Sequence, residues 1–191
     1  MTRIIRGAVA AALVGVIFVV PAVYCRYVGV TSKRLRTVDP GRFYRSGQMT
    51  AEGFADAVER FHIRTIVNVQ TDVPDPDIDR SYWSCRTIKE SELCRKLGVR
   101  YVHLVPTFLP SFLIPENRLS IIDQLLYVLH DEANYPVLIH CYAGLHRTGL
   151  LTAIYRMKFQ GWTREQAFLD MTAQGPGKWS GKWKVLLQIN R

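Results

Sequence analysis

One unit of strand, glycine-containing loop and helix constrains the fold of this chain more than any other feature. Residues 137–140 read Val-Leu-Ile-His, with the apolar and β-branched character of a buried strand. A short loop containing Gly144 follows, and residues 147–159 then have the pattern of a helix. In open α/β sheets, ligands bind beyond the carboxyl ends of the strands, and a helix N-terminus attracts anions. We therefore expect an anion-binding site at this loop.

The remaining residues continue the alternation of strands and helices. The 191 residues suffice for one compact domain with an appendage. This alternation predicts an α/β fold, with a central, mostly parallel sheet flanked by helices. Residues 72–79 and 107–115 are interpreted as loops. Further strands are expected at 42–45, 65–69 and 100–105, and helices at 49–61 (N-cap Thr50), 88–97, 116–130 and 164–172 (N-cap Thr163).

The N-terminus is interpreted as one transmembrane helix that precedes the domain. Residues 7–24 form an uncharged run of 18 residues, which as a helix would be about 27 Å long, close to the hydrocarbon thickness of a bilayer. A cleavable signal peptide is the alternative, and it would leave a secreted or periplasmic protein. We favour an uncleaved single-pass anchor, because Tyr24 and Cys25 make a poor cleavage site. Basic residues flank both ends of the run, so they leave the side of the membrane open.

The expected organisation follows from these segments. Residues 1–25 form the membrane anchor or signal segment, 26–37 a basic linker, and 38–191 the domain with a basic C-terminal tail. The net charge of +9 belongs to the two ends, since residues 46–173 contain 13 basic and 15 acidic residues. Basic flanks are typical of contact with membrane lipid, whereas nucleic-acid binding needs a basic face on the folded domain. We expect membrane lipid as a partner and no nucleic acid.

The cysteines do not indicate a metal site. Cys25, Cys85, Cys94 and Cys141 form no C-x-x-C pair and supply no paired metal ligands. A Cys85–Cys94 disulfide stays open for an oxidising compartment. We expect neither a metal nor another cofactor.

The loop after the buried strand has the residue types that attack on a phosphate ester requires. Cys141 begins the loop, where the helix dipole and Arg147 favour its thiolate. The planar guanidinium of Arg147 can bind two phosphate oxygens side by side. The Thr148 hydroxyl can donate to the sulfur. Together these groups fit a reaction through a covalent thiophosphate.

Residues 140–149 resemble the Cys-x5-Arg signature of protein tyrosine and dual-specificity phosphatases, in the form His-Cys-x-x-Gly-x-x-Arg-Thr-Gly. Residues 43–48 are similar to a stretch near the start of atypical dual-specificity phosphatases of bacterial and plant or fungal type, and the resemblance covers about 38–173. It implies Cys141 as nucleophile, Arg147 as phosphate ligand, Thr148 as helper of the thiolate and His140 as structural support. The phosphate would contact the loop residues Tyr142, Ala143, Gly144, Leu145, His146 and Arg147.

The usual proton donor of these phosphatases is missing from its expected place. That donor is an aspartate on a mobile loop, but residues 106–115 contain no carboxylate. Asp72 is our candidate from the acidic loop after the 65–69 strand, which also contains Asp75, Asp77 and Asp79. His146 is the second candidate.

Three functions are compatible with this sequence. The leading one is a protein tyrosine or dual-specificity phosphatase that acts on a phosphorylated protein. The second is a phosphoinositide or inositol (pyro)phosphate phosphatase, although no lysine lies between Cys141 and Arg147, so Arg45, Arg86 or Arg118 would have to supply the extra charge. The third is a catalytically weak phosphate-binding module, favoured by the missing loop aspartate.

Overall fold

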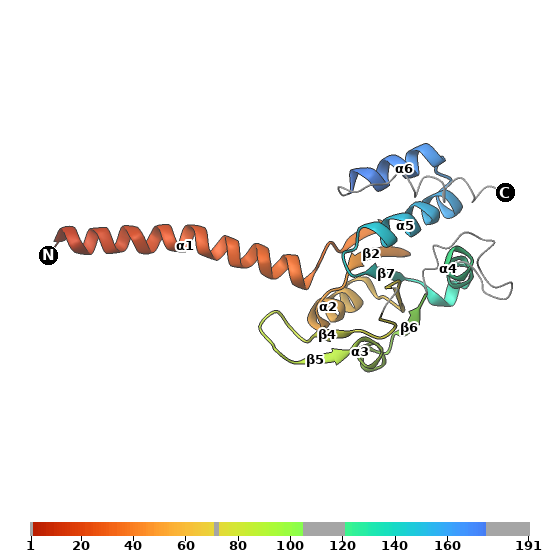
Figure 1. Ribbon diagram of the computed structural model, residues 1–191, viewed down its shortest axis with the longest axis horizontal. Coiled ribbons are helices and arrows are strands. Elements are labelled where there is room, and N and C mark those ends of the chain that lie inside the picture. Colours follow the sequence, from red (N-terminus) through yellow and green to blue (C-terminus); the bar gives the residue numbers. More distant parts are fainter. Residues whose placement is uncertain (1, 71–72, 105–120, 175–191) are drawn as a thin grey trace.

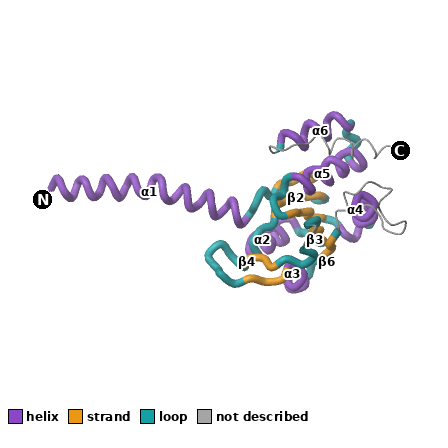
Figure 2. The backbone as a smooth tube through the Cα atoms, in the orientation of Figure 1, coloured by secondary structure: helices purple, strands orange, loops and turns teal. Residues whose placement is uncertain are grey.

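A five-stranded sheet forms the centre of the domain. The computed structural model describes residues 2–70, 73–104 and 121–174. The sheet has the strand order β1-β2-β7-β3-β6, with β1 antiparallel to β2 and every other pair parallel (Figures 1 and 2). The strands are β1 (Arg36–Asp39), β2 (Phe43–Gly47), β3 (Thr65–Asn68), β6 (Arg100–His103) and β7 (Val137–Cys141).

Helices cover both faces of this sheet, which confirms the predicted fold class. α2 (Ala51–Phe61) and α3 (Glu90–Leu97) lie on one face, and α5 (His146–Phe159) and α6 (Arg164–Ala173) lie on the other (Figure 1). α4 (Ile121–His130) packs with α5, and the short 3-10 helix η2 (Glu132–Asn134) precedes β7.

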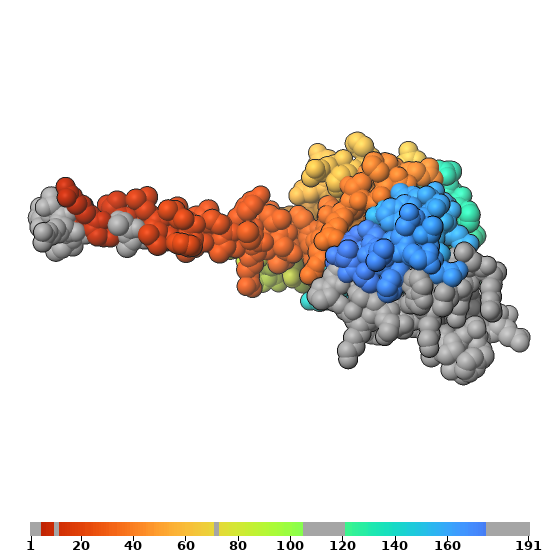
Figure 3. All heavy atoms as spheres, turned by 90° about the horizontal axis from the view of Figure 1, so that it is seen from above, coloured from red at the N-terminus to blue at the C-terminus, as the bar shows by residue number. Residues whose placement is uncertain are grey.

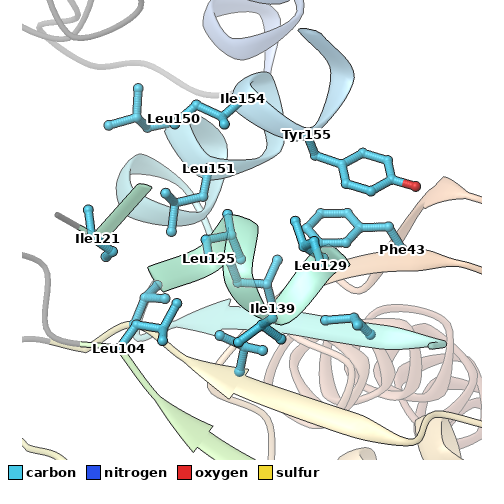
Figure 4. Close-up of a cluster of buried hydrophobic side chains, with 14 of the residues drawn as sticks. Phe43, Leu104, Ile121, Leu125, Leu129, Ile139, Leu150, Leu151, Ile154 and Tyr155 are labelled. Carbon is cyan, nitrogen blue, oxygen red and sulfur yellow. The ribbon is translucent and has the colours of Figure 1, made fainter. Parts of the chain in front are cut away.

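The central strand β7 supplies side chains to both faces. Val137, Ile139 and Cys141 join the core formed with α4, α5 and α6, while Leu138 joins the core of α2 and α3. In the first core the ring of Phe43 stacks on Tyr155 with 4.2 Å between centroids (Figure 4). This alternation reflects the period of two in a strand that is buried on both sides.

The expected N-caps are present. The Thr50 hydroxyl accepts a hydrogen bond of 3.2 Å from the Gly53 N–H, which satisfies one free donor at the start of α2. Thr163 and Gln166 form a capping box at the start of α6, where each side chain bonds the backbone N–H of the other residue.

The acidic stretch was only partly predicted correctly. Within 72–79, β4 (Asp77–Asp79) pairs antiparallel with β5 (Thr87–Lys89), so α3 begins at Glu90 rather than at 88. Each of these strands buries one isoleucine, Ile78 or Ile88, and exposes its neighbours. Strands of three residues are too short for a periodic signal. β1, which has four residues and pairs irregularly with β2, was also missed. The expected loop at 107–115 lies outside the described residues.

The N-terminal helix α1 (Thr2–Thr31) extends away from the domain (Figures 1 and 3). Within Ile5–Thr31, the most apolar window of 18 residues has a mean hydropathy of 2.5 and is not buried inside the protein. By length and composition this helix could span a membrane. A signal sequence near the N-terminus has the same length and composition. It also includes residues 26–31 of the stretch interpreted as a linker.

The end of α1 contacts the domain closely. A Cβ atom on Gly53 would lie 1.8 Å from the carbonyl oxygen of Thr31, so only glycine allows the start of α2 to approach α1 this closely. Tyr27 of α1 also meets Tyr82 edge to face, with 5.8 Å between ring centroids.

The substitution Leu138→Ala tests the importance of β7 for stability. Leu138 is fully buried, so its truncation should lower the free energy of unfolding by about 2–5 kcal/mol through lost burial and a residual cavity. Denaturant unfolding of the full chain in detergent micelles measures this loss. The same truncation at the exposed Leu169 is the control, and equal losses from the two variants would contradict the assignment of the core.

Candidate active site

The loop between β7 and α5 is shaped by a close approach of two backbones. Gly144 has a φ of +69°, and a Cβ atom there would lie 2.4 Å from the Gly47 nitrogen. Any other residue would therefore be strained in its backbone and would collide with the end of β2. The glycine expected to let this loop wrap is thus required at this position.

The sulfur of Cys141 lies at the focus of the loop. Its Sγ accepts hydrogen bonds from the Gly144 N–H at 3.2 Å and from the Thr148 hydroxyl at 3.0 Å. Burial alone would raise the pKa of this thiol. The hydrogen bonds from the Thr148 hydroxyl and from the backbone N–H groups of Thr148, Gly144 and Leu145 outweigh burial, so the pKa of Cys141 lies below its ordinary value.

Arg45 holds the same loop from behind. Its side chain is buried, and Nη2 donates to the carbonyl oxygens of Gly144 at 2.9 Å and Leu145 at 3.4 Å. Nη1 donates to Gln174 Oε1 at 2.9 Å. Burial, with repulsion from Arg36, lowers the pKa of Arg45 to about 10, so the group stays charged at neutral pH. Because Arg45 holds these carbonyls on the outside of the loop, the N–H groups are left facing the sulfur.

Residues 43–48 therefore have a structural role that the resemblance alone did not specify. Gly47 pairs with Cys141 across the sheet, and the Gln48 N–H donates to the Tyr142 carbonyl at 3.1 Å. Gln70 in turn donates to the Gln48 side chain at 2.8 Å. This stretch forms one wall of the loop. Arg45, which we had considered as a substrate contact, is part of that wall.

A buried polar network begins at His140, the residue before Cys141. His140 Nε2 and Glu90 Oε1 are 2.6 Å apart, and both side chains are fully buried. Asn68 donates to Glu90 at 3.4 Å and to the Tyr101 hydroxyl at 3.0 Å, and Tyr101 donates to the Pro74 carbonyl at 2.6 Å. The network links β7 to β3, β6 and α3. The sequence contains no signal that links Glu90 to His140, because 50 positions separate the two residues.

Arg147 and His146 open helix α5 beside this loop. Arg147 is half-buried. Its guanidinium forms no hydrogen bond or ion pair with any residue that the structure describes. His146 is exposed at the first position of the helix. Both side chains are therefore placed at the helix N-terminus where an anion would bind.

The acidic-loop candidates separate into distinct environments. Asp75 and Asp77 have structural partners, which are Ser91 at the start of α3 for Asp75 and Lys89 for Asp77. Asp79 instead lines a pocket of about 210 Å³ that also contains Tyr142 of the loop. Asp72 lies outside the described residues.

Two basic residues after α1 contact the loop from the other side. The Arg34 Nη1 donates to the Ala143 carbonyl at 2.9 Å. The Lys33 ammonium lies 3.9 Å from the centroid of the Tyr142 ring. Both residues belong to the stretch that the sequence predicts as a basic linker, because only tertiary packing brings them to a loop more than 100 positions away.

No metal centre accompanies this site in the part of the chain that the structure describes. Residues 2–70, 73–104 and 121–174 contain no cluster of three or more His, Cys, Asp or Glu side chains. All four cysteines are free thiols, so Cys85 and Cys94 are not bonded to each other.

The combined geometry defines a class of protein. A cysteine ends a parallel strand, a glycine loop directs N–H groups at its sulfur, and arginine and threonine follow in the first turn of a helix. This is the architecture of a cysteine-dependent phosphatase.

The sequence comparison identifies the family. Residues 30–170 match the model of the tyrosine phosphatase family, and the chain belongs to that family. It is similar to the dual specificity protein phosphatase TpbA of Pseudomonas aeruginosa over 134 residues, or 70% of this chain, with 29% or 42% identity depending on the strain. It is also 48% identical over 59 residues to the inositol diphosphatase DSP4 of Arabidopsis thaliana, covering 31% of this chain and 28% of that protein.

These relatives are longer proteins. The chain spans about half the length of TpbA, 51% in each strain. Among solved structures, the core catalytic domain of the PP-IP phosphatase SIW14 from Saccharomyces cerevisiae superposes with a TM-score of 0.61. That match has 20% identity and covers 84% of this chain and 87% of the other, so it supports the fold.

Thr148→Val tests how the thiolate is stabilised. The substitution removes the hydroxyl that donates to Cys141 Sγ, so the pKa of Cys141 should rise, because the thiolate loses a hydrogen bond that stabilises it. The pH dependence of iodoacetamide alkylation measures this pKa. Thr152→Val is the matched control, because the buried Thr152 hydroxyl donates to the Thr148 carbonyl and not to the sulfur. An unchanged alkylation profile in Thr148→Val would contradict the assignment.

Arg45→Met tests the support behind the loop. Loss of the hydrogen bonds to the Gly144 and Leu145 carbonyls should lower kcat/KM for an aryl phosphate about tenfold or more. It should also raise the pKa of Cys141, because a nearby positive charge is removed. Arg45→Lys keeps the charge without the paired donors and should restore the thiol pKa better than the rate. If thermal stability fell while both readouts stayed at wild-type values, Arg45 would serve folding alone.

Proposed function

We propose that this chain hydrolyses phosphomonoesters through a cysteinyl-phosphate intermediate, with phosphotyrosine or a related phosphorylated protein side chain as its leading substrate class. The observation that carries the proposal is the position of Cys141 Sγ, which accepts hydrogen bonds from the Gly144 N–H and the Thr148 hydroxyl at the start of α5. Membership of the tyrosine phosphatase family supports it.

The reaction proceeds in two displacements. The Cys141 thiolate attacks phosphorus, the S–P bond forms and the bond to the leaving oxygen breaks as that oxygen gains a proton. Water then attacks the cysteinyl phosphate, which releases inorganic phosphate and regenerates the thiolate. The loop N–H groups and the Arg147 guanidinium stabilise the charge on the transferred phosphoryl group in both steps.

The surrounding residues receive roles in this proposal. Arg147 binds two phosphate oxygens, and Thr148 stabilises the sulfur as thiolate and as leaving group. His140, held by Glu90, positions the end of β7. Asp72 and His146 are the proposed proton donors for the leaving oxygen.

A phosphoinositide or inositol (pyro)phosphate is the second candidate substrate. Two observations favour it: relatives of this chain bear the name inositol diphosphatase, and Lys33 places a cation next to Tyr142 of the loop. A third function, a phosphate-binding module with weak turnover, predicts ligand binding without catalysis.

We also infer that α1 is a single-pass membrane anchor. Among the described residues, the most apolar 18-residue window of α1 is not buried against the domain, and an exposed apolar surface of this size suits contact with lipid. The domain would then work beside membrane lipid, on the side where α1 ends.

The proposal is tested with a substrate panel on the full chain in detergent micelles. Cys141→Ser should abolish turnover of p-nitrophenyl phosphate, because serine at this position is a much weaker nucleophile, while binding of phosphorylated ligands persists. Vanadate should inhibit the wild type and EDTA should have no effect. Phosphotyrosyl peptides and phosphoinositides are then ranked by kcat/KM. Turnover that survives in Cys141→Ser would refute the mechanism, and binding without wild-type turnover would favour the binding module.

A further inference from the structure

Lys33 is fixed against the wall of the phosphate loop. The Gly47 N–H donates to the Lys33 carbonyl at 2.7 Å, so the backbone is tied to the end of β2. The side-chain stem lies on Gly47, where a Cβ atom would come within 2.9 Å of Lys33 Cγ. The ammonium then lies over the Tyr142 ring, 3.9 Å from its centroid. Lys33 is therefore a positioned cation at the loop rather than part of a solvated linker.

In the part of the chain that the structure describes, no carboxylate forms an ion pair with Lys33. Burial, and then repulsion from Arg34, lowers the pKa of Lys33, while the negative charge of Cys141 acts in the opposite direction. A half-buried cation without a counter-ion gains from the arrival of an anion.

Lys33 lines a pocket of about 210 Å³. Its polar lining combines the Lys33 cation with groups that suit hydroxyls. The amide nitrogen of Gln48 and the hydroxyl hydrogen of Thr50 can donate, and the carboxylate of Asp79 can accept. Tyr142 forms the boundary with the phosphate loop. The remaining lining residues are Gly29, Val30 and Met49.

We propose that this pocket is a second substrate subsite, which binds a further phosphate group on a polyol whose phosphomonoester occupies the loop at Cys141, with Lys33 as the cation of the subsite. The inference rests on the proposed phosphatase activity and deepens it. A ligand with two phosphates needs a positive charge beyond that of Arg147. Arg45 does not supply it, because its guanidinium bonds the carbonyls of Gly144 and Leu145 behind the loop, so the proposal assigns this role to Lys33.

The same ligand chemistry has two sources. An inositol ring with two phosphate groups occurs in free inositol phosphates and in the headgroups of phosphoinositide lipids. Gly29 and Val30 belong to α1, so the subsite lies at the end of the helix inferred to be the anchor. The experiment therefore compares dioctanoyl phosphatidylinositol 4-phosphate with its deacylated headgroup, glycerophosphoinositol 4-phosphate.

Each of these substrates carries one phosphomonoester and one phosphodiester on the inositol ring. The test measures the ratio of kcat/KM for each of them to that for p-nitrophenyl phosphate, using the full chain in detergent micelles. Lys33→Met keeps the apolar stem on Gly47 and removes the ammonium. It should lower the ratio about tenfold, the effect expected from losing a charge-assisted hydrogen bond at a half-buried site. Lys33→Arg should restore most of it. Lys96→Met, which removes an exposed lysine paired with Glu92 on α3, is the matched control.

Binding measurements make the outcome independent of turnover. In the Cys141→Ser background, calorimetry should show that Lys33→Met weakens binding of glycerophosphoinositol 4-phosphate about tenfold. An equal change for all substrates, or unchanged affinity, would overturn the subsite. Suppose that the wild-type protein turns over no substrate but binds glycerophosphoinositol 4-phosphate more tightly than Lys33→Met does. That result would refute the phosphatase proposal and still support the subsite. A preference for the lipid over its free headgroup identifies the membrane as the source.

Discussion

The contact between the Arg45 guanidinium and the carbonyl oxygens of Gly144 and Leu145 is the interaction on which the geometry of the site depends. A loop that points several N–H groups at one sulfur must point its carbonyls elsewhere, and buried carbonyls need donors. A buried arginine supplies these donors in one rigid group. The depressed pKa of Cys141 follows from this arrangement, since its N–H donors are held in place before substrate arrives.

The sheet explains why these parts meet. β2, β3 and β7 run parallel and in register, with Gly47 opposite Cys141 and Asn68 opposite His140. Their carboxyl ends therefore bring the loop wall, the nucleophile and the His140–Glu90 pair to one edge. Burying such a charged or polar pair is costly unless its members bond to each other and to neighbours, and here Asn68 donates a further hydrogen bond to Glu90.

The end of the N-terminal helix is part of the same site. Arg34 bonds the Ala143 carbonyl, Lys33 lies on Gly47 and Tyr142, and Thr31 fits against Gly53. A segment that would ordinarily be a tether thus contacts the phosphate loop directly. If α1 is a membrane anchor, as we propose, these contacts hold the loop at Cys141 close to the membrane surface. That position suits substrates that are part of the membrane.

Local sequence determined the α/β class, the strand–loop–helix unit, the caps at Thr50 and Thr163, and the residues of the phosphate loop. These features depend on periodicity, capping and glycine chemistry within about fifteen neighbouring residues. The position of Arg45 behind the loop, the pairing of His140 with Glu90 and the contact of Lys33 with Tyr142 join residues 50 to 109 positions apart. Charge and hydropathy along the chain contain no signal for such contacts. The parallel register of the sheet decided that Arg45 and the His140–Glu90 pair support the loop. The docking of α1 decided that Lys33 lies beside the loop, where we propose that it binds a ligand.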